Sequence, residues 1–308
     1  MKINLSVIII NYNTSALTFN CVLSILKQTS KNLTYEIIVI DNASSFEEYN
    51  DLKKMIDRLS NEKVFLFRSK LNGGFSAGNM LGVQFAKGEY LAFINNDVLL
   101  VEDSFTYPID YLKKNKHVGI VGIQPIFENN EKQVAFGHFD TFTNRLLGYW
   151  LFEKLFPKKT KRHLDYKNPI SVDYVVGSYM LMKASHFYNA GGFDVNLFLY
   201  FEEMDICKRF MKNNLATVFI PHINYIHING ASTSLGYVKK IELKISHLYV
   251  VRKNYGFFNY ALLKYFFIVV FLLKSLVNPK HLKMLYTLVF LGAPLASSIK
   301  HKQIIQER

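Results

Sequence analysis

The sequence contains little cysteine: only 2 of its 308 residues, Cys21 and Cys207. Two cysteines are too few for a disulfide scaffold or a cysteine-based metal framework, so we expect a reducing, cytoplasmic setting. The apolar run at residues 6–10 is short and ends at Asn11, so we expect a buried strand there and no secretion signal. Half of the residues are hydrophobic, which excludes a disordered chain and suffices for a large core.

Acidic residues are scarce in one part of the chain only. The whole sequence has 37 Lys and Arg against 24 Asp and Glu, a formal net charge of +13. Residues 239–308 hold 12 basic and 2 acidic side chains, whereas residues 1–238 hold 25 and 22. The tail therefore carries +10 and the rest only +3, so we divide the chain into a nearly neutral domain, 1–238, and a basic tail, 239–308.

The tail also lacks an apolar run long enough to cross a bilayer, which needs about 18–20 residues. Its two longest runs, 265–273 and 285–296, are interrupted or bounded by lysines: Lys264, Lys274, Lys283 and Lys300. Lysines among aromatic and aliphatic faces are typical of amphipathic helices that lie on an anionic membrane surface. A helical pair packed on the main domain or on a partner is the alternative. We expect no nucleic-acid partner, because a DNA-binding helix would not carry so much aliphatic surface.

Short β-branched runs alternate with segments of helical spacing in the first hundred residues. The runs predict strands at 6–10, 36–40, 64–67 and 90–94, and the spacing predicts helices at 14–29, 46–60 and 76–87. Such alternation is typical of an α/β fold with a mostly parallel, Rossmann-like central sheet and flanking helices. Further strands are predicted at 118–127 and 171–176, and another helix from about 183.

Polar residues or glycines follow each of the first four strands, at 11–13, 41–45, 72–79 and 95–97. Parallel α/β sheets bind ligands in the crevice beyond the carboxyl ends of their strands, so these residues predict one binding site. The sequence lacks a phosphate-loop motif, and Gly73-Gly74-x-x-x-Gly78 does not have the spacing of dinucleotide-binding loops. Nicotinamide and phosphate-loop chemistry are therefore disfavoured.

Carboxylates at two places are candidates for chemistry in this crevice. Asp97 ends an apolar strand, where it could hold a divalent cation against a diphosphate, although an Asp after a strand is also a common turn former. Glu202 and Glu203 follow the apolar run FLYF, and adjacent desolvated carboxylates raise one another's pKa, as a general base requires. The alternative is that they only begin a helix. His227 lies between apolar residues and is either a ligand or a core histidine.

Six sequence blocks occur in this order: SVIIINYN, VIDNASS, NGGFSAGNMLG, FINNDV, VVGSYMLMKASHFYNAGGFDVNLFLYFEEMDICKR and HINGAS. Together they resemble glycosyltransferase family 2, and more narrowly its bacterial rhamnosyltransferase-like branch. The resemblance covers residues 4 to about 235. It implies a GT-A fold in which a nucleotide-diphosphate sugar is held across the strand ends.

The resemblance also implies which residues bind the donor. The nucleotide-sugar contacts would be Asn11, Asn13, Asp41, Asn42, Asn72, Gly73, Gly78, Asn95, Asn96 and Asp97. In the family pattern, the asparagines at 11 and 13 border the base, and Asp41 bonds the base or the ribose. The loop that contains Asn72, Gly73 and Gly78 matches the one that closes over the nucleoside.

A metal site is implied by the same resemblance. Asp97 matches the last carboxylate of the family's D-x-D-like motif, and Asn95 stands at its first position. His227 matches a histidine that contacts the metal or the diphosphate. The implied cofactor is a divalent cation, Mg²⁺ or Mn²⁺.

The acceptor side has a different set of residues. The catalytic base of the family matches Glu203, with Glu202 as the alternative because the usual pair is Glu-Asp. Gly177 and Asp194 are expected to face the acceptor or the donor sugar. Asp205 and Arg209 match the family as structural support.

The resemblance and the basic tail together predict an inverting glycosyltransferase on the cytoplasmic face of the bacterial inner membrane. The expected donor is dTDP-L-rhamnose and the expected acceptor a lipid-linked glycan of cell-surface polysaccharide synthesis. A UDP-hexose or UDP-galactofuranose donor is the nearest alternative. A membrane-bound protein that binds nucleotide sugars without catalysis is the alternative of another class. The sequence predicts no oligomeric state.

Overall fold

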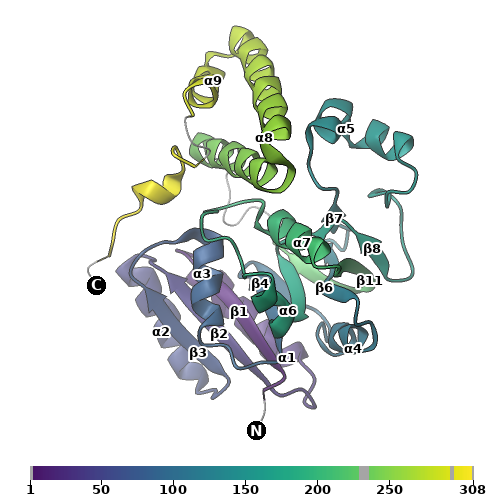
Figure 1. The fold of residues 1–308 in the computed structure, drawn as a ribbon. Coiled ribbons are helices and arrows are strands. Elements are labelled where there is room, and N and C mark those ends of the chain that lie inside the picture. Colours follow the sequence, from purple (N-terminus) through teal and green to yellow (C-terminus); the bar gives the residue numbers. More distant parts are fainter. Residues whose placement is uncertain (1–2, 229–235, 292–294, 307–308) are drawn as a thin grey trace.

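A nine-stranded sheet runs through the computed structural model of the chain, which describes residues 3–228, 236–291 and 295–306 (Figure 1). Its strand order is β3-β2-β1-β4-β10-β6-β11-β5, with β8 paired to β11. The strands are β1 (Leu5–Asn11), β2 (Tyr35–Asn42), β3 (Val64–Ser69), β4 (Tyr90–Asn95), β5 (Val98–Leu100), β6 (Val118–Ile126), β8 (Ile170–Val172), β10 (Tyr179–Lys183) and β11 (Ala216–His227).

Strands β1 to β4 form the parallel part of the sheet. β1 pairs with both β2 and β4, and β2 pairs with β3, all in parallel. β1 and β2 are rich in Ile and Val and almost wholly buried, as is typical of parallel strands that helices cover on both faces. β10 runs antiparallel between β4 and β6, and β11 runs parallel to β6. The prediction of a mostly parallel α/β sheet is confirmed.

Helices cover both faces of this sheet (Figure 1). One face carries α1 (Ser15–Gln28), α2 (Phe46–Leu59) and α4 (Thr106–Lys114). The other face carries α3 (Gly74–Val83), α6 (Ala184–Asn189) and α7 (Glu202–Lys212). The helices expected at 14–29 and 46–60 are confirmed as α1 and α2. The third begins two residues early and ends at Val83, because residues 84–86 continue with tighter i→i+3 hydrogen bonds.

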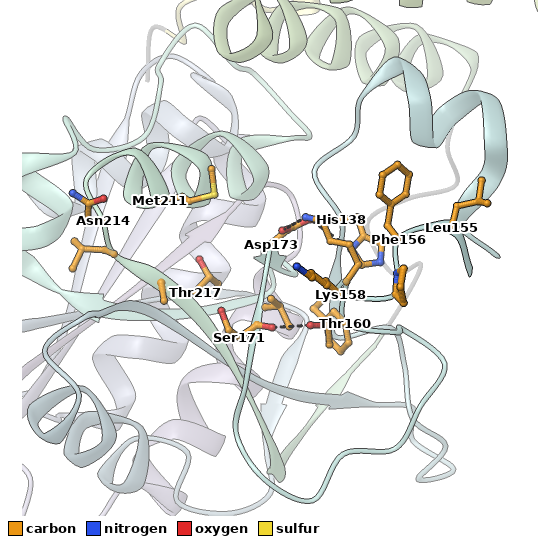
Figure 2. Close-up of a pocket in the computed structure, with 16 residues that line it drawn as sticks. His138, Leu155, Phe156, Lys158, Thr160, Ser171, Asp173, Met211, Asn214 and Thr217 are labelled. Atoms are coloured by element: carbon orange, nitrogen blue, oxygen red, sulfur yellow. Dashed lines mark hydrogen bonds and ion pairs between the residues drawn. The ribbon is translucent and has the colours of Figure 1, made fainter. Parts of the chain in front are cut away.

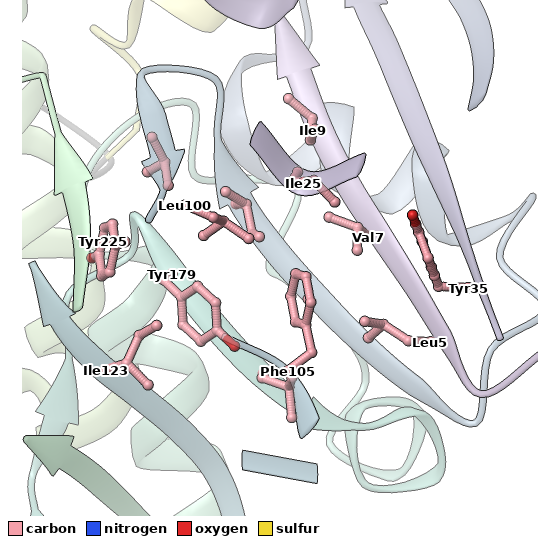
Figure 3. Packing of buried hydrophobic residues seen from close by; sticks show 14 of the residues in the cluster. Leu5, Val7, Ile9, Ile25, Tyr35, Leu100, Phe105, Ile123, Tyr179 and Tyr225 are labelled. Atoms are coloured by element: carbon pink, nitrogen blue, oxygen red, sulfur yellow. The ribbon is translucent and has the colours of Figure 1, made fainter. Parts of the chain in front are cut away.

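Two hydrophobic cores separate these layers. Successive side chains of a strand point to opposite faces, so β1 contributes to both cores. Leu5 and Val7 pack in the cluster that includes Ile25 of α1 (Figure 3), whereas Ile8 belongs to the core beneath α3. The close approach of α3 depends on Gly82, where a Cβ atom would lie 2.6 Å from Ile8 Cγ2. This packing holds the carboxyl ends of β1, β2 and β4 at one edge.

The strand predicted at 171–176 is two strands that belong to different sheets. β8 ends at Val172, and β9 (Tyr174–Val175) pairs with β7 (Phe136–Gly137). The chain changes sheets at Asp173, whose carboxylate accepts hydrogen bonds from Lys159 Nζ and from the backbone N–H of Phe139. Between β7 and β8 lies α5 (Phe142–Leu155), which is kinked at Gly148.

The C-terminal tail forms a long helix, α8 (Tyr237–Val277), broken at Gly256, where φ is 83°. Its first half packs on the layers before it: Lys253 Nζ lies 2.7 Å from Asp194 and 2.9 Å from Asp205. Its second half shares a small core with α9 (Leu282–Val289), which it reaches through the 3₁₀ turn η1 (Pro279–His281). The last element is η2 (Ile299–Lys302). The boundary expected at residue 238 falls in the first turn of α8, and the division into two domains stays a prediction.

Within the described part of the chain, α8 is the one helix whose length and composition suit a membrane span, with a mean hydropathy of 2.0 over 18 residues. This corrects the expectation that the lysines leave every apolar segment too short. The segment after the kink, 257–277, measures about 31 Å at the usual helical rise. Length and composition therefore allow a span as well as an interfacial position.

A close backbone contact joins the glycine loop before α3 to the segment before α7. Gly74 has a φ of +76°, and a Cβ atom there would lie 2.1 Å from the carbonyl oxygen of Phe198. The same carbonyl accepts a hydrogen bond of 2.8 Å from the N–H of Phe75. Only glycine combines this backbone conformation with this approach. The contact therefore fixes the position of the segment that leads into α7.

Substituting Gly74 by Ala should destabilise the protein more than the matched substitution Gly191→Ala. Gly191 has a similar φ of +80°, but a Cβ atom there would meet nothing within 4 Å. Gly191→Ala should cost about 1–2 kcal/mol of unfolding free energy from backbone strain alone. Gly74→Ala should cost about 1–3 kcal/mol more, because the segments must also move apart. Denaturant unfolding of both variants measures the difference, and equal losses would contradict the docking role of Gly74.

Candidate active site

A cavity of about 720 Å³ lies beyond the carboxyl ends of β1 and β4, opposite the N-terminus of α7. Ten of the predicted site residues line it: Asn13, Asn42, Asn72, Asn95, Asn96, Asp97, Gly177, Glu202, Glu203 and His227. The strand ends supply the amides and Asp97, and the start of α7 supplies the two glutamates. The structure thus brings together residues that lie more than a hundred positions apart in the sequence.

Asn11 and Asp41 lie beneath the cavity floor and do not line it. Asn11 Nδ2 donates hydrogen bonds to Asp41 Oδ1 (2.9 Å) and to Ser44 Oγ (3.1 Å), and both Asn11 and Asp41 are fully buried. Ser44 Oγ in turn accepts from the N–H of Asn13. The two side chains therefore hold the loops that carry the lining asparagines at 13 and 42.

Gly73 and Gly78 also lie outside the cavity lining. The N–H of Gly73 donates to Asn42 Oδ1 (3.1 Å), while Asn42 Nδ2 donates to Asn72 Oδ1 (3.0 Å). A Cβ atom at Gly78 would lie 2.8 Å from Ile10 Cδ1, so this glycine lets α3 approach β1. In this structure the two glycines shape the loop and helix behind the lining side chains.

Asp97 and His227 meet because β11 runs antiparallel to β5, which pairs His227 with Val98. Asp97 Oδ1 lies 3.4 Å from His227 Nε2, and Asp97 is only 6% exposed. The N–H of Ile228 donates to the carbonyl oxygen of Asp97, which fixes the junction. The rest of the block that contains His227, residues 229–232, lies outside the described residues.

A carboxylate and an imidazole facing one cavity fit a divalent cation that takes its other ligands from phosphates and water. The described residues contain no group of three or more His, Cys, Asp or Glu side chains placed to hold a metal. Asp97 and His227 thus suit an ion that arrives with a diphosphate and not a permanent protein-bound metal.

A strained turn precedes the two glutamates. Tyr200 and Phe201 both have positive φ angles, 75° and 70°, which are costly for residues with side chains. The first half of α8 holds the turn: His247 stacks on the Phe201 ring at 4.5 Å, and Ser246 Oγ donates to the carbonyl oxygen of Leu199. The turn directs the N-terminus of α7 into the cavity.

Glu202 is buried, and Glu203 is partly exposed to the cavity that it lines. Burial raises the pKa of the Glu202 carboxyl, and the neighbouring charge of Glu203 raises it further. Burial also raises the pKa of Glu203. Glu202 Oε1 has no hydrogen-bond partner among the described residues, while Glu203 Oε2 lies 3.6 Å from where a Cβ atom of Gly177 would be. Carboxylates with raised pKa values are suited to accept a proton near neutral pH.

Asp194 does not line the cavity. Its Oδ2 accepts hydrogen bonds from Tyr249 Oη (2.8 Å) and Lys253 Nζ (2.7 Å), and these contacts hold the pKa of its carboxyl below the usual range, against its partial burial. Asp205 similarly binds Arg209 and Lys253. In this structure Asp194 attaches α8 to the segment before α7, and Asp205 attaches α8 to α7 itself.

The sequence interpretation missed three lining residues from the tail: Lys239 of α8, Ile299 of η2 and Gln303. Ile299 and Gln303 reach the cavity because Glu242, buried in α8, accepts hydrogen bonds from Ser298 Oγ (2.6 Å) and the N–H of Ile299. The chain end continues to the N–H of Gln306, which donates to the carbonyl oxygen of Lys70. A signal existed, because Glu242 is one of only two acids in a basic, apolar tail.

A second cavity of similar volume, about 730 Å³, lies at the other end of α7 (Figure 2). Its lining includes Met211 near the end of α7, Asn214 after that helix, Asp173, and the end of α5 at Leu155. None of the predicted site residues lines this cavity. The first cavity is therefore the candidate active site.

Comparisons with known proteins show which family this chain is similar to. The family model described as Glycosyl transferase family 2 matches residues 6–189. Rhamnosyltransferase WbbL of Escherichia coli (strain K12) is 23% identical over 193 residues, covering 59% of this chain and 71% of that protein. Poly(ribitol-phosphate) beta-N-acetylglucosaminyltransferase TarP of Staphylococcus aureus (strain N315) is 29% identical over 117 residues, 38% of this chain and 35% of that protein.

Among solved structures, GalNAc-T7 with UDP, GalNAc and Mn²⁺ is similar with a TM-score of 0.62 and 18% identity. The match covers 81% of this chain and 48% of that one, so this chain corresponds to about half of that protein. This likeness concerns the fold and confirms the predicted GT-A architecture. Since the family model matches more than half of the residues, the chain belongs to glycosyltransferase family 2.

Proposed function

We propose that this glycosyltransferase transfers a sugar from a nucleoside diphosphate to an acceptor hydroxyl with inversion at the anomeric carbon. The observation that carries the proposal is that one cavity holds two kinds of chemistry. The pair Asp97 and His227 suits a metal-bound diphosphate, and the desolvated carboxylates Glu202 and Glu203 suit a proton acceptor. The family match ends at residue 189, so the roles of these glutamates and of His227 rest on their geometry and on the sequence motifs.

The donor would occupy the strand-end side of the cavity. The lining amides of Asn13 and Asn72 would offer hydrogen bonds to a nucleoside, while Asn42 holds the loop of Asn72 through its own hydrogen bonds. Asp97 and His227 would hold Mg²⁺ or Mn²⁺. When bound, the divalent cation supplies positive charge to the leaving diphosphate. The buried pair Asn11 and Asp41 keeps the amide-bearing loops in place.

Glu203 would act as the general base. The acceptor oxygen attacks the anomeric carbon, the bond from that carbon to the diphosphate oxygen breaks, and its electron pair leaves with the diphosphate. The proton of the acceptor hydroxyl passes to the Glu203 carboxylate, whose raised pKa suits this transfer. A single displacement needs one base and no enzyme nucleophile. Attack from the side opposite the leaving group inverts the configuration.

The proposed donor is dTDP-L-rhamnose, and the similarity to the rhamnosyltransferase WbbL supports rhamnose as the sugar. A UDP-hexose or UDP-galactofuranose donor is the rival, and a hydrolysis panel of nucleotide sugars separates the two. A protein that binds nucleotide sugars without catalysis would not need desolvated carboxylates opposite Asp97 and His227, the two residues proposed to hold the metal. Turnover of any donor in that panel excludes this alternative.

The proposed acceptor is a lipid-linked glycan at the cytoplasmic face of the bacterial inner membrane. The second half of α8 and α9 support a membrane contact, because they expose large apolar side chains: Phe257, Phe258, Tyr265, Leu273, Leu276, Val277, Tyr286 and Phe290. Lysines at 264, 274, 280 and 283 accompany them and suit anionic headgroups. The first half of α8 packs on the catalytic layers instead, as expected for a helix packed on the main domain. We therefore propose the membrane contact for the second half of the helix.

Replacing Glu203 by Gln should lower kcat by about 10²- to 10⁴-fold, the usual contribution of a general base. Donor binding should change little, because Gln keeps the size of the side chain. The matched variant Glu202→Gln should retain most of the turnover, because Glu202 is buried whereas the Glu203 carboxylate faces Gly177 in the cavity. Steady-state kinetics and donor titration of the two variants measure this difference. Loss of turnover in Glu202→Gln alone would move the base assignment to Glu202.

Replacing Asp97 by Asn should weaken nucleoside-diphosphate binding in the presence of Mn²⁺ by about 10- to 100-fold, a range typical of perturbed metal sites. Addition of EDTA should remove most of the difference in nucleoside-diphosphate affinity between Asp97→Asn and the unaltered chain. Asp110→Asn, at an exposed carboxylate on α4, serves as the control and should bind normally. Titration calorimetry with UDP and dTDP gives the dissociation constants. Equal affinity with and without Mn²⁺ in the unaltered chain would contradict the metal site.

A further inference from the structure

An apolar surface that is not formed by tail residues lies on α5. Leu146, Trp150 and Leu155 are 58%, 73% and 56% exposed, and Trp150 is the only tryptophan of the sequence. Gly148 has a φ of 71° and breaks the helix between Leu146 and Trp150. Large exposed apolar side chains gathered on one short element indicate a contact surface.

The opposite side of α5 is firmly attached to the protein. Glu153 Oε1 lies 2.9 Å from His138 Nε2 and 3.3 Å from Arg162 Nε, and the Phe152 ring packs beside the His138 ring at 5.5 Å. At the start of the helix, Arg145 contacts Asp140 at 2.7 Å. The outward position of Trp150 is therefore a property of the fold, since the inward side of α5 is already occupied.

The charged residues of α5 and of the segment that follows it are mostly basic. Residues 141–164 contain six Lys or Arg and a single acid, Glu153, which is buried and paired as described. Lys154 and Lys158 are exposed, and Lys154 Nζ lies 5.3 Å from the centre of the Trp150 ring. Exposed lysines beside tryptophan and leucine match the composition of helices that contact anionic lipid headgroups.

α5 adjoins the apolar hairpin of the tail. The two elements project from the same end of the molecule, away from the N-terminus (Figure 1), and the rings of Phe142 and Phe266 contact edge to face at 6.2 Å. His247 of α8 lies 3.2 Å from Asp140, which also binds Arg145 of α5. The surface of α5 is therefore continuous with the surface that we propose to contact the membrane.

We propose that α5 is a second membrane-binding element, and that Trp150 inserts at the headgroup level of an anionic bilayer beside the α8–α9 hairpin. The inference rests on the membrane association proposed for the tail. Two contacts on different elements fix the orientation of a protein on a surface, whereas one contact leaves it free to tilt. The α5 contact would thereby hold the active-site cavity in one orientation to a lipid-linked acceptor.

The single tryptophan makes the test direct, because emission excited where the 19 tyrosines do not absorb reports on Trp150 alone. Vesicles of phosphatidylcholine with 30% phosphatidylglycerol should shift the emission to shorter wavelength, and lipids brominated on their acyl chains should quench it. Trp150→Ser should weaken vesicle binding about tenfold or more, the loss expected when a large apolar side chain is no longer buried. Phe46→Ser, at an exposed aromatic residue on α2, is the matched control and should bind normally.

Sedimentation with the same vesicles separates the two proposals. If the full chain sediments while its emission and quenching stay unchanged, the role of α5 is wrong and membrane association by the tail stands. If the full chain does not sediment with anionic vesicles, the proposed membrane association itself is wrong. Normal vesicle binding by Trp150→Ser would likewise overturn the insertion of Trp150.

Discussion

The contact between Gly74 and the backbone of Phe198 is the constraint on which the site depends. It joins the glycine loop of the parallel half-sheet to the turn before α7, at a distance that no side chain at position 74 permits. Tyr200 and Phe201 then adopt left-handed conformations, which the ring of His247 helps to hold. Strain of this kind persists only where the surrounding structure determines it, and it is common at functional sites. Here it aims two glutamates at the cavity that Asp97 and His227 line.

The parallel half of the site was predictable from the sequence because its signals are local. A Val- and Ile-rich run followed by asparagines predicts a strand and also identifies the polar side chains at its carboxyl end. Cavity-lining residues such as Asn13 and Asp97 were predictable in this way. What depends on distant contacts was not predictable. Asn11 and Asp41 bind each other beneath the floor, Asp194 is paired with Lys253 of the tail, and Gln303 reaches the cavity through contacts such as those of Glu242. A sequence pattern gives residue types at strand ends but does not show which of them another segment covers.

The positive charge of the chain has several functions in the structure. Lys253 neutralises Asp194 and Asp205, and Lys239 lines the cavity, so part of the tail belongs to the catalytic layers. The remaining lysines of the tail accompany exposed aromatic residues on α8 and α9, and the lysines near α5 accompany Trp150. The sequence suggests a division of charge at residue 238. In the structure the positive charges are instead grouped by surface, because the lysines near α5 and those of α8 and α9 belong to the surface that we propose to contact the membrane.

We propose that one carboxylate in this cavity serves a single displacement. Proton NMR of the sugar that the full chain releases from a nucleotide sugar, recorded before the product mutarotates, tests this mechanism. In a single displacement, the first anomer to appear has the configuration opposite to that of the donor. A product that retains the donor configuration would contradict it, because retention requires either a covalent intermediate or attack on the same face as the leaving group.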